Sequence, residues 1–331
     1  MKKDRNYGLD ILRVIAIISV LSVHFFLNTK YYDVSKNGIG MKMQYVIRNI
    51  FMICVPLFIL LTGYLNNNKK YDKKFFKGLL NVIIIWLFYS IVEFTVKAYI
   101  TNDLEELTFK NLLLAVTSFK ACRYSWYIEM YIGLYLLSPI INNAYDNFES
   151  KDKKILLFIS IIIFILPGLI NDLLKDYVHF PNWWYSVYPL GYYITGKYLK
   201  DMKPKYNKLL LTTLFISMQI ITFLLIKKSN IVFESLTVYL SSVIVFLLFY
   251  DVNIKSKFLK TIIVTISIMS LDIYLASSLV DHIVYTIFNS KMALYNIPQS
   301  RCILFAPIVL IITFILSSLY ASFRRVLINI R

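Results

Sequence analysis

The sequence predicts an all-α fold: a polytopic membrane bundle of about ten transmembrane helices that forms a single integral-membrane domain over residues 1–331. Hydrophobic residues make up 58% of the chain, whereas soluble domains contain roughly 45–50%. Charged residues make up only 17% and fall mainly between long apolar runs. The runs lack the alternation of a membrane barrel, so only helices would satisfy their backbone groups inside a bilayer.

Each apolar run has about the length that a helix needs to cross the hydrocarbon layer, roughly 20 residues. The fourth, sixth and ninth runs contain polar residues, which makes them the weakest of the set. We expect spans at residues 8–29, 44–66, 76–100, 124–143, 154–171, 182–199, 208–227, 232–250, 261–283 and 301–322.

The net charge of +17 raises the question of a nucleic-acid partner, but the distribution of charge argues against one. Lys and Arg lie between the apolar runs and form no basic face, as expected where positive loops fix membrane orientation. With a cytoplasmic N-terminus, 22 Lys and Arg fall on the inner side, and 13 fall on the outer side or its helix ends. Lys227 and Lys228 fall outside and oppose this arrangement. The bias predicts an even number of spans and two cytoplasmic termini.

The cysteines Cys54, Cys122 and Cys302 have neither metal-site spacing nor a disulfide framework, so we expect no bound metal. The first apolar run, from Ile11 to Leu27, lacks a small-residue cleavage site. We therefore expect it to stay in the protein as a span.

The first expected helix contains three ionisable residues, Asp10, Arg13 and His24. Such groups are expensive inside a bilayer and mark functional positions by default. The offset of eleven positions from Arg13 to His24 brings both to one face, about 16 Å apart, and Asp10 can pair with Arg13. The alternative is that Asp10 and Arg13 anchor the helix at the interface while His24 makes a structural hydrogen bond.

Other expected spans also contain ionisable residues. Glu129 follows Trp126 and Tyr127, and it is either structural or a group that orients a base or binds a sugar hydroxyl. Glu93 is expected to pair with Lys97 in a structural role. Asp272 is a second expected buried carboxylate, and Asp281 and His282 end the ninth span at the outer face.

Several segments contain recognisable motifs. The first, RNYGLDILRVIAIISVLSVHFF, contains Arg-x10-His at Arg13 and His24. The second, VPLFILLTGYL, differs from V-P-L-F-F-x-x-S-G-Y-L chiefly in having Thr62 for the serine. The fourth, SWYIEMYIGLYLLSPII, contains Trp-Tyr followed by Leu-Tyr-Leu-Leu-x-Pro. In combination these segments resemble acyltransferase family 3, the membrane O-acyltransferases.

The resemblance continues to about residue 285. FPNWWYSVYPLGYYITGKYL is similar to the subgroup that modifies surface polysaccharides, of the enterobacterial common antigen O-acetyltransferase type. In SLDIYLASSLVDH, Ser277 replaces a histidine that is usual in the family, which puts the role of that position in doubt. Lys73, Lys74 and Lys77 stand where the family usually has arginines.

The resemblance implies transfer of an acetyl or other small acyl group from cytoplasmic acyl-CoA to a hydroxyl of a surface glycan or its lipid-linked precursor. The resemblance implies catalytic roles for His24, as base or acyl carrier, and for Arg13. If the first and fourth spans meet, Glu129 would orient the imidazole, a role that we expect only because both residues lie in buried spans. Arg13 with Lys73, Lys74 and Lys77 would bind the coenzyme, although a plain positive-inside loop explains these lysines equally. The implied acceptor-binding residues are Trp126, Tyr127, Asp272 and His282.

Two other functions compete with this one. A polysaccharide transporter or flippase would also need about ten spans and interior charges, and a sensory membrane module would modify nothing itself. The expected location is a bacterial cytoplasmic membrane, because low Gly and Pro with abundant Lys, Ile, Asn and Tyr suggests an AT-rich genome. The sequence is also compatible with a homo-oligomer.

Overall fold

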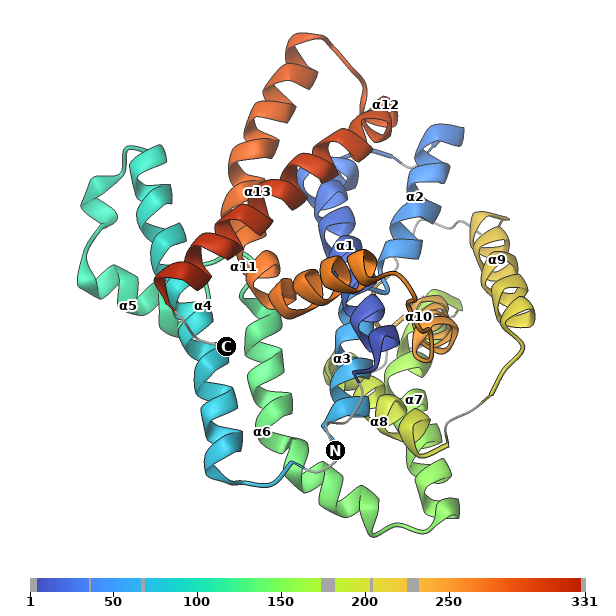
Figure 1. The fold of residues 1–331 in the computed structure, drawn as a ribbon. Helices are drawn as coiled ribbons and strands as arrows, with labels where there is room; N and C mark the ends of the chain where they lie inside the picture. Colours follow the sequence, from blue (N-terminus) through green and yellow to red (C-terminus); the bar gives the residue numbers. More distant parts are fainter. Residues whose placement is uncertain are drawn as a thin grey trace. The chain divides into compact units, whose positions relative to one another are not determined.

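The fold is described from a computed structural model, which covers residues 5–35, 37–66, 69–173, 182–202, 205–224 and 232–328. Within these ranges every regular element is a helix (Figure 1), which confirms the all-α prediction. The α-helices are α1 Tyr7–Asn28, α2 Ile39–Phe51, α3 Cys54–Leu65, α4 Lys73–Ile100, α5 Phe109–Thr117, α6 Trp126–Asp146, α7 Ser150–Leu173, α8 Tyr188–Met202, α9 Lys208–Leu224, α10 Leu236–Phe249, α11 Lys257–Leu294, α12 Gln299–Cys302 and α13 Ala306–Leu327. Four short 3₁₀ helices join them: η1 Tyr31–Asp33, η2 Leu104–Glu106, η3 Asn182–Val187 and η4 Ile303–Phe305.

Five helical segments in the described ranges are long and apolar enough to cross a membrane. They are Tyr7–Asn28, Ile39–Leu65, Lys73–Ile100, Lys257–Leu294 and Gln299–Leu327. Two shorter helices, α9 and α10, are apolar as well. The chain is thus a multi-pass membrane protein, whereas the expected count of about ten spans is not confirmed. Each expected run nevertheless coincides with at least one helix, except that residues 225–227 of the seventh lie outside the described ranges.

The second expected span is interrupted between α2 and α3, at Met52 and Ile53. Pro56 explains the break, because it has no N–H to donate to the Met52 carbonyl one turn earlier. The Cys54 thiol lies 3.9 Å from that carbonyl and partly replaces the missing donor. The ninth span was expected to end at residue 283, whereas α11 extends to Leu294. The short helix α5 was not expected.

The chain divides into two compact units. Unit 1 comprises Met1–Asn67, Ala144–Ile268 and Ile297–Ala306, and unit 2 comprises Asn68–Asn143, Met269–Asn296 and Pro307–Arg331. Unit 1 therefore contains α1, α2, α3 and α7 to α10, together with the first turns of α11. Unit 2 contains α4, α5, most of α6, the remainder of α11 and nearly all of α13. Both units combine distant segments of the chain.

In unit 1, α1 and α10 are antiparallel neighbours. Gly8 lies so close to the carbonyls of Phe249 and Tyr250 that a Cβ on Gly8 would overlap them. Near the other end of α1, Val23 packs against a cluster that contains Val238 at the start of α10. The N-terminal end of α1 is thereby placed beside the segment that connects α10 to α11.

Helices α3 and α8 pack closely in unit 1 (Figure 1), and two glycines make the approach possible. A Cβ on Gly63 would overlap the carbonyl oxygen of Tyr193, and a Cβ on Gly196 would overlap that of Leu60. The contacts are reciprocal, because each glycine meets the residue three positions before the other. Both glycines lie in a Thr-Gly pair, within LLTGYL and YITGKYL.

Helix α2 has its polar face turned inward. Gln44, Arg48 and Asn49 are buried, whereas Ile39 and Met43 are 73% and 54% exposed. A helix of a soluble protein shows the opposite arrangement. The inversion is expected where apolar side chains face lipid and polar ones face a protein interior.

Candidate active site

Helix α1 contains Arg13 and His24, two of the three residues for which the sequence predicted catalysis. Asn6 caps its N-terminus, because its side-chain oxygen accepts hydrogen bonds from Gly8 N at 2.9 Å and Leu9 N at 3.4 Å. The helix is continuous from Tyr7 to Asn28, so the expected spacing of about 16 Å between Arg13 and His24 is retained.

Asp10 is the centre of an ion cluster at the start of α1. It is 2% exposed and accepts hydrogen bonds from Arg5 Nε at 2.7 Å and Arg5 Nη2 at 2.9 Å. Arg13 Nη1 donates to it at 3.2 Å, and the Ser267 hydroxyl donates at 2.6 Å. The predicted pairing of Asp10 with Arg13 is confirmed. Two guanidinium groups share one carboxylate, so the cluster has a net positive charge.

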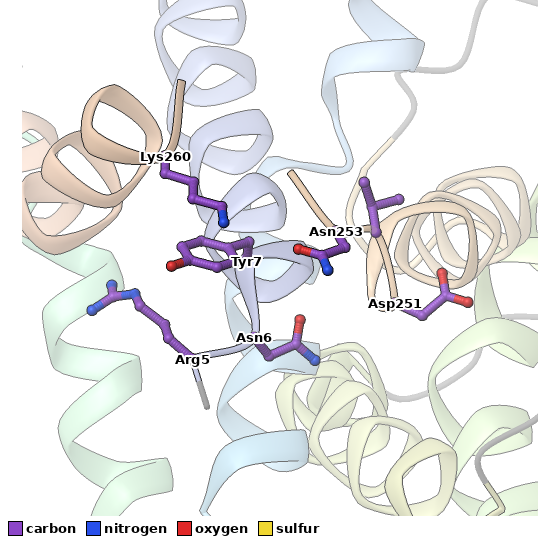
Figure 2. A pocket seen from close by; sticks show the side chains of 7 residues that line it. Arg5, Asn6, Tyr7, Asp251, Asn253 and Lys260 are labelled. Atoms are coloured by element: carbon purple, nitrogen blue, oxygen red, sulfur yellow. The ribbon is translucent and has the colours of Figure 1, made fainter. Parts of the chain in front are cut away.

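A pocket of about 580 Å³ opens beside this cluster in unit 1. It is lined by Arg5, Asn6, Tyr7, Asp251, Val252, Asn253 and Lys260. Figure 2 shows the Lys260 side chain reaching over the Tyr7 ring, where its ammonium lies 4.8 Å from the ring centroid. Arg5 belongs both to the pocket wall and to the Asp10 cluster, so it joins the pocket to Arg13. Apart from Asp251, the polar lining groups are cationic or neutral, and Asp251 is bound by Lys208 at 2.8 Å.

His24 lies in the interior of unit 1, with only 7% of its surface exposed. Its carbonyl accepts a hydrogen bond from Asn28 Nδ2 at 2.8 Å. The adjacent Val23 packs against Tyr45 and Met52. His24 thus faces protein, as the expected acyl transfer requires. Arg13 is held in place by the Asp10 cluster.

Sequence reasoning missed the buried polar groups of α2. Arg48 is 5% exposed and donates to the Tyr32 hydroxyl at 2.7 Å. Asn49 donates to Gln219 of α9 at 3.2 Å, and Gln44 donates to the Gln299 carbonyl at 3.0 Å. Arg48 lies inside the second expected span, and the rule that singled out Arg13 would have found it there.

Asp272 lies in unit 2 and is 1% exposed, so its expected burial is confirmed. Arg324 binds one carboxylate oxygen through Nε at 2.8 Å and also through Nη2. Arg325 Nε binds the other oxygen at 2.9 Å, and Tyr89 donates at 3.3 Å. Both carboxylate oxygens therefore accept hydrogen bonds from the protein. These bonds are explained by packing of α4, α11 and α13 as well as by a role of Asp272 in binding an acceptor.

Glu129 is exposed in the first turn of α6, so the expectation of a buried carboxylate is wrong. The helix begins at Trp126, close to the expected start of this span at residue 124, and Glu129 is exposed while its neighbour Ile128 is buried, so Glu129 lies on the outward face of the helix. Trp126 is 40% exposed and Tyr127 is 8% exposed, and His282 on α11 is half-buried. The catalytic role of Glu129 and the acceptor-binding roles of the other residues stay predictions.

The expected coenzyme-binding lysines Lys73, Lys74 and Lys77 are exposed in the first turns of α4. Asp72 caps this helix by accepting from Phe75 N at 2.7 Å. The exposed ammonium groups are available to an anion, as they would also be in a plain positive-inside loop.

Glu93 pairs with Lys97 at 2.5 Å, which confirms the expected ion pair. It also accepts from the Ser278 hydroxyl at 2.8 Å. Over the described ranges, no group of three His, Cys, Asp or Glu side chains is arranged to hold a metal ion.

The fold and this site define a class: a helical multi-pass membrane protein with an ion cluster and a buried histidine on its first helix. The family model of the acyltransferase domain matches residues 6–322. The chain therefore belongs to acyltransferase family 3, as its motifs indicate, and is an acyltransferase. The comparison with curated proteins finds no match, and neither does the comparison with solved structures.

Proposed function

We propose that the protein transfers a small acyl group, acetyl in the simplest case, from acyl-CoA in the cytoplasm to a hydroxyl of a surface glycan or its lipid-linked precursor. One observation supports this most directly: a single helix has the Arg13 cluster and a polar pocket at one end and the buried His24 near the other. A charged coenzyme cannot cross a bilayer. Its thioester can nevertheless reach the acceptor if its flexible arm extends along α1.

Contacts within unit 1 support the sidedness of this proposal. Lys208 and Asp251 are joined at 2.8 Å, and both belong to segments assigned to the cytoplasm by charge. Tyr7 and Lys260 also meet, and they too belong to inner segments. The pocket would therefore open toward the cytoplasm, where acyl-CoA is found.

Segments assigned to the outside also meet each other. Gln299 Nε2 donates to the Thr29 hydroxyl at 3.4 Å, and the Gln299 carbonyl accepts from Gln44 at 3.0 Å. His24 lies five residues before Thr29, which belongs to this outer group, so a little more than one helical turn separates them. An acceptor that approaches from outside would thus meet His24 before Arg13.

The chemistry follows from these positions. The acceptor oxygen attacks the thioester carbonyl carbon, the carbon–sulfur bond breaks, and an ester forms. His24 takes the hydroxyl proton and returns it to the departing thiolate, which leaves as the free thiol of the coenzyme. In the alternative, an imidazole nitrogen first displaces the thiolate and holds the acyl group until the hydroxyl attacks. Arg13 would hold a coenzyme phosphate by charge-assisted hydrogen bonds.

We predict that His24→Ala lowers acyl transfer at least about 100-fold, because general acid–base catalysis typically contributes 10²–10⁴. The measurement is incorporation of label from radioactive acetyl-CoA into glycan in membrane vesicles of an expressing bacterium. Ser22→Ala is a matched control on the same helix, because the Ser22 hydroxyl donates to the Ile18 carbonyl at 2.9 Å.

A fully active His24→Ala variant, present in the membrane at the normal level, would remove His24 from the mechanism. Absence of any incorporation by the wild type, together with movement of glycan across the vesicle membrane, would favour a transporter instead.

A further inference from the structure

We propose that the pocket beside α1 binds the phosphorylated adenosine end of the acyl-CoA donor, with Tyr7 as the platform for the purine and Arg5 and Lys260 as phosphate ligands. This inference rests on the proposed function, since it names where one end of that donor binds. The pocket volume of about 580 Å³ lies within the range of roughly 300–1,000 Å³ that is usual for small-molecule sites.

The charges of the pocket suit an anion. Arg5 uses Nε and Nη2 to bind Asp10, which leaves its Nη1 donors for a ligand as far as the described residues are concerned. The Lys260 side chain is half-buried and reaches over the pocket (Figure 2). Exposed Lys255 and Lys257 follow the pocket residue Asn253 along the chain and add positive charge nearby. A ligand with several phosphates would gain charge-assisted hydrogen bonds here.

The remaining lining groups favour a nucleotide over an anion of any kind. Tyr7 offers an aromatic ring, on which a purine can stack in place of the Lys260 ammonium. Asn253 lies across the pocket from Arg5 (Figure 2) and has the amide donor and acceptor that pair with the edge of adenine. An anionic lipid headgroup would need the two cations but neither the ring nor the amide.

The Asp10 cluster places this subsite in line with the proposed chemistry. Asp10 binds both Arg5 in the pocket wall and Arg13 on α1. Phosphates held at Arg5 and Lys260 would lie at the N-terminal end of α1. The pantetheine arm could then extend past Arg13 toward His24.

The test is binding of 3′-phosphoadenosine 5′-diphosphate, measured by calorimetry on the purified full-length protein in phosphatidylcholine nanodiscs. We expect Tyr7→Leu and Lys260→Gln each to weaken binding about tenfold or more, because one loses base stacking and the other a charged hydrogen bond. Lys260→Arg should largely restore binding. Lys151→Gln, which removes an exposed cation of α7 outside the pocket lining, is the matched control and should leave the Kd within about twofold of the wild type.

Four outcomes are informative. Wild-type binding that neither Tyr7→Leu nor Lys260→Gln weakens, in proteins that melt at the wild-type temperature, would overturn the inference. If phosphatidylglycerol added to the nanodiscs competes with the nucleotide, and pyrophosphate alone weakens nucleotide binding equally, the pocket is a lipid-headgroup site. That result would also overturn the inference. Nucleotide binding that is sensitive to both variants supports it. Failure of acetyl-CoA incorporation despite such binding would refute the proposed function and leave the pocket assignment standing.

Discussion

At the residue scale, Asp10 organises the part of the candidate site at the N-terminal end of α1. The carboxylate is buried and accepts hydrogen bonds from two guanidinium groups and the Ser267 hydroxyl. Such a group helps to fix the positions of both arginines, because each loses its ion pair with Asp10 if the charge is removed. We therefore propose Asp10 as a positioning residue, which would act on the donor through Arg5 and Arg13.

We predict that Asp10→Asn raises the KM for acetyl-CoA at least about tenfold, since a neutral amide cannot hold two guanidinium groups in place. The kcat should change less than the KM, because His24 is about 21 Å from Asp10 along the helix. Steady-state transfer kinetics measure both quantities. Asp33→Asn, which changes an exposed acid in η1, is the control. An unchanged KM in the Asp10→Asn variant would contradict the positioning role.

At the element scale, the contact of α3 with α8 depends on having no side chain at two positions. Gly63 and Gly196 each face a backbone carbonyl of the other helix. Backbone atoms cannot move aside as a flexible side chain can, so a methyl group there must separate the helices. Small residues at helix contacts are a usual means of close approach in membranes.

We predict that Gly63→Ala and Gly196→Ala each lower the unfolding free energy by about 1–3 kcal/mol, the typical cost of overpacking. Gly133→Ala is the matched control on α6, where a Cβ would meet nothing within 4 Å. That control should be neutral or stabilising, because alanine is favoured over glycine within a helix by roughly 0.5–1 kcal/mol. Thermal unfolding in detergent compares the three variants. Equal melting temperatures for all three would show that the close contact is dispensable.

At the scale of the whole molecule, charge and contacts give the same sidedness within unit 1. Segments with excess Lys and Arg meet one another around the pocket, and the segments of the opposite side meet around Gln299. This agreement supports the proposed topology, in which successive spans cross the membrane in opposite directions and the N-terminus lies in the cytoplasm. Several residues of the charge count lie outside the described ranges: Lys2, Lys3, Lys36, Lys175, Lys203, Lys227, Lys228 and Arg331.

We predict that a membrane-impermeant maleimide labels Lys42→Cys from outside intact cells and labels Lys255→Cys only after the membrane is permeabilised. Both positions are exposed. The three native cysteines are buried and free, so the wild-type chain should give a low background. Labelling of Lys255→Cys in intact cells would reverse the proposed orientation.

The sequence by itself determined the helical membrane class, the family, and the Arg13–His24 spacing. These depend on local properties: run length and apolarity select helices in a bilayer, and the helical repeat fixes two residues on one helix relative to each other. The Asp10–Arg13 and Glu93–Lys97 pairs were predictable for the same reason, since each pair is one turn apart.

Only the tertiary structure decided which distant residues meet. Ser267 and Arg5 donate hydrogen bonds to Asp10. Arg324 and Arg325 donate to Asp272. The Lys260 ammonium lies over the Tyr7 ring. Glu129 was expected to be buried and is exposed, because the face that a helix turns toward its neighbours is set by packing beyond the local pattern. Burial and long-range pairing depend on how helices assemble, and no spacing along one segment contains that information.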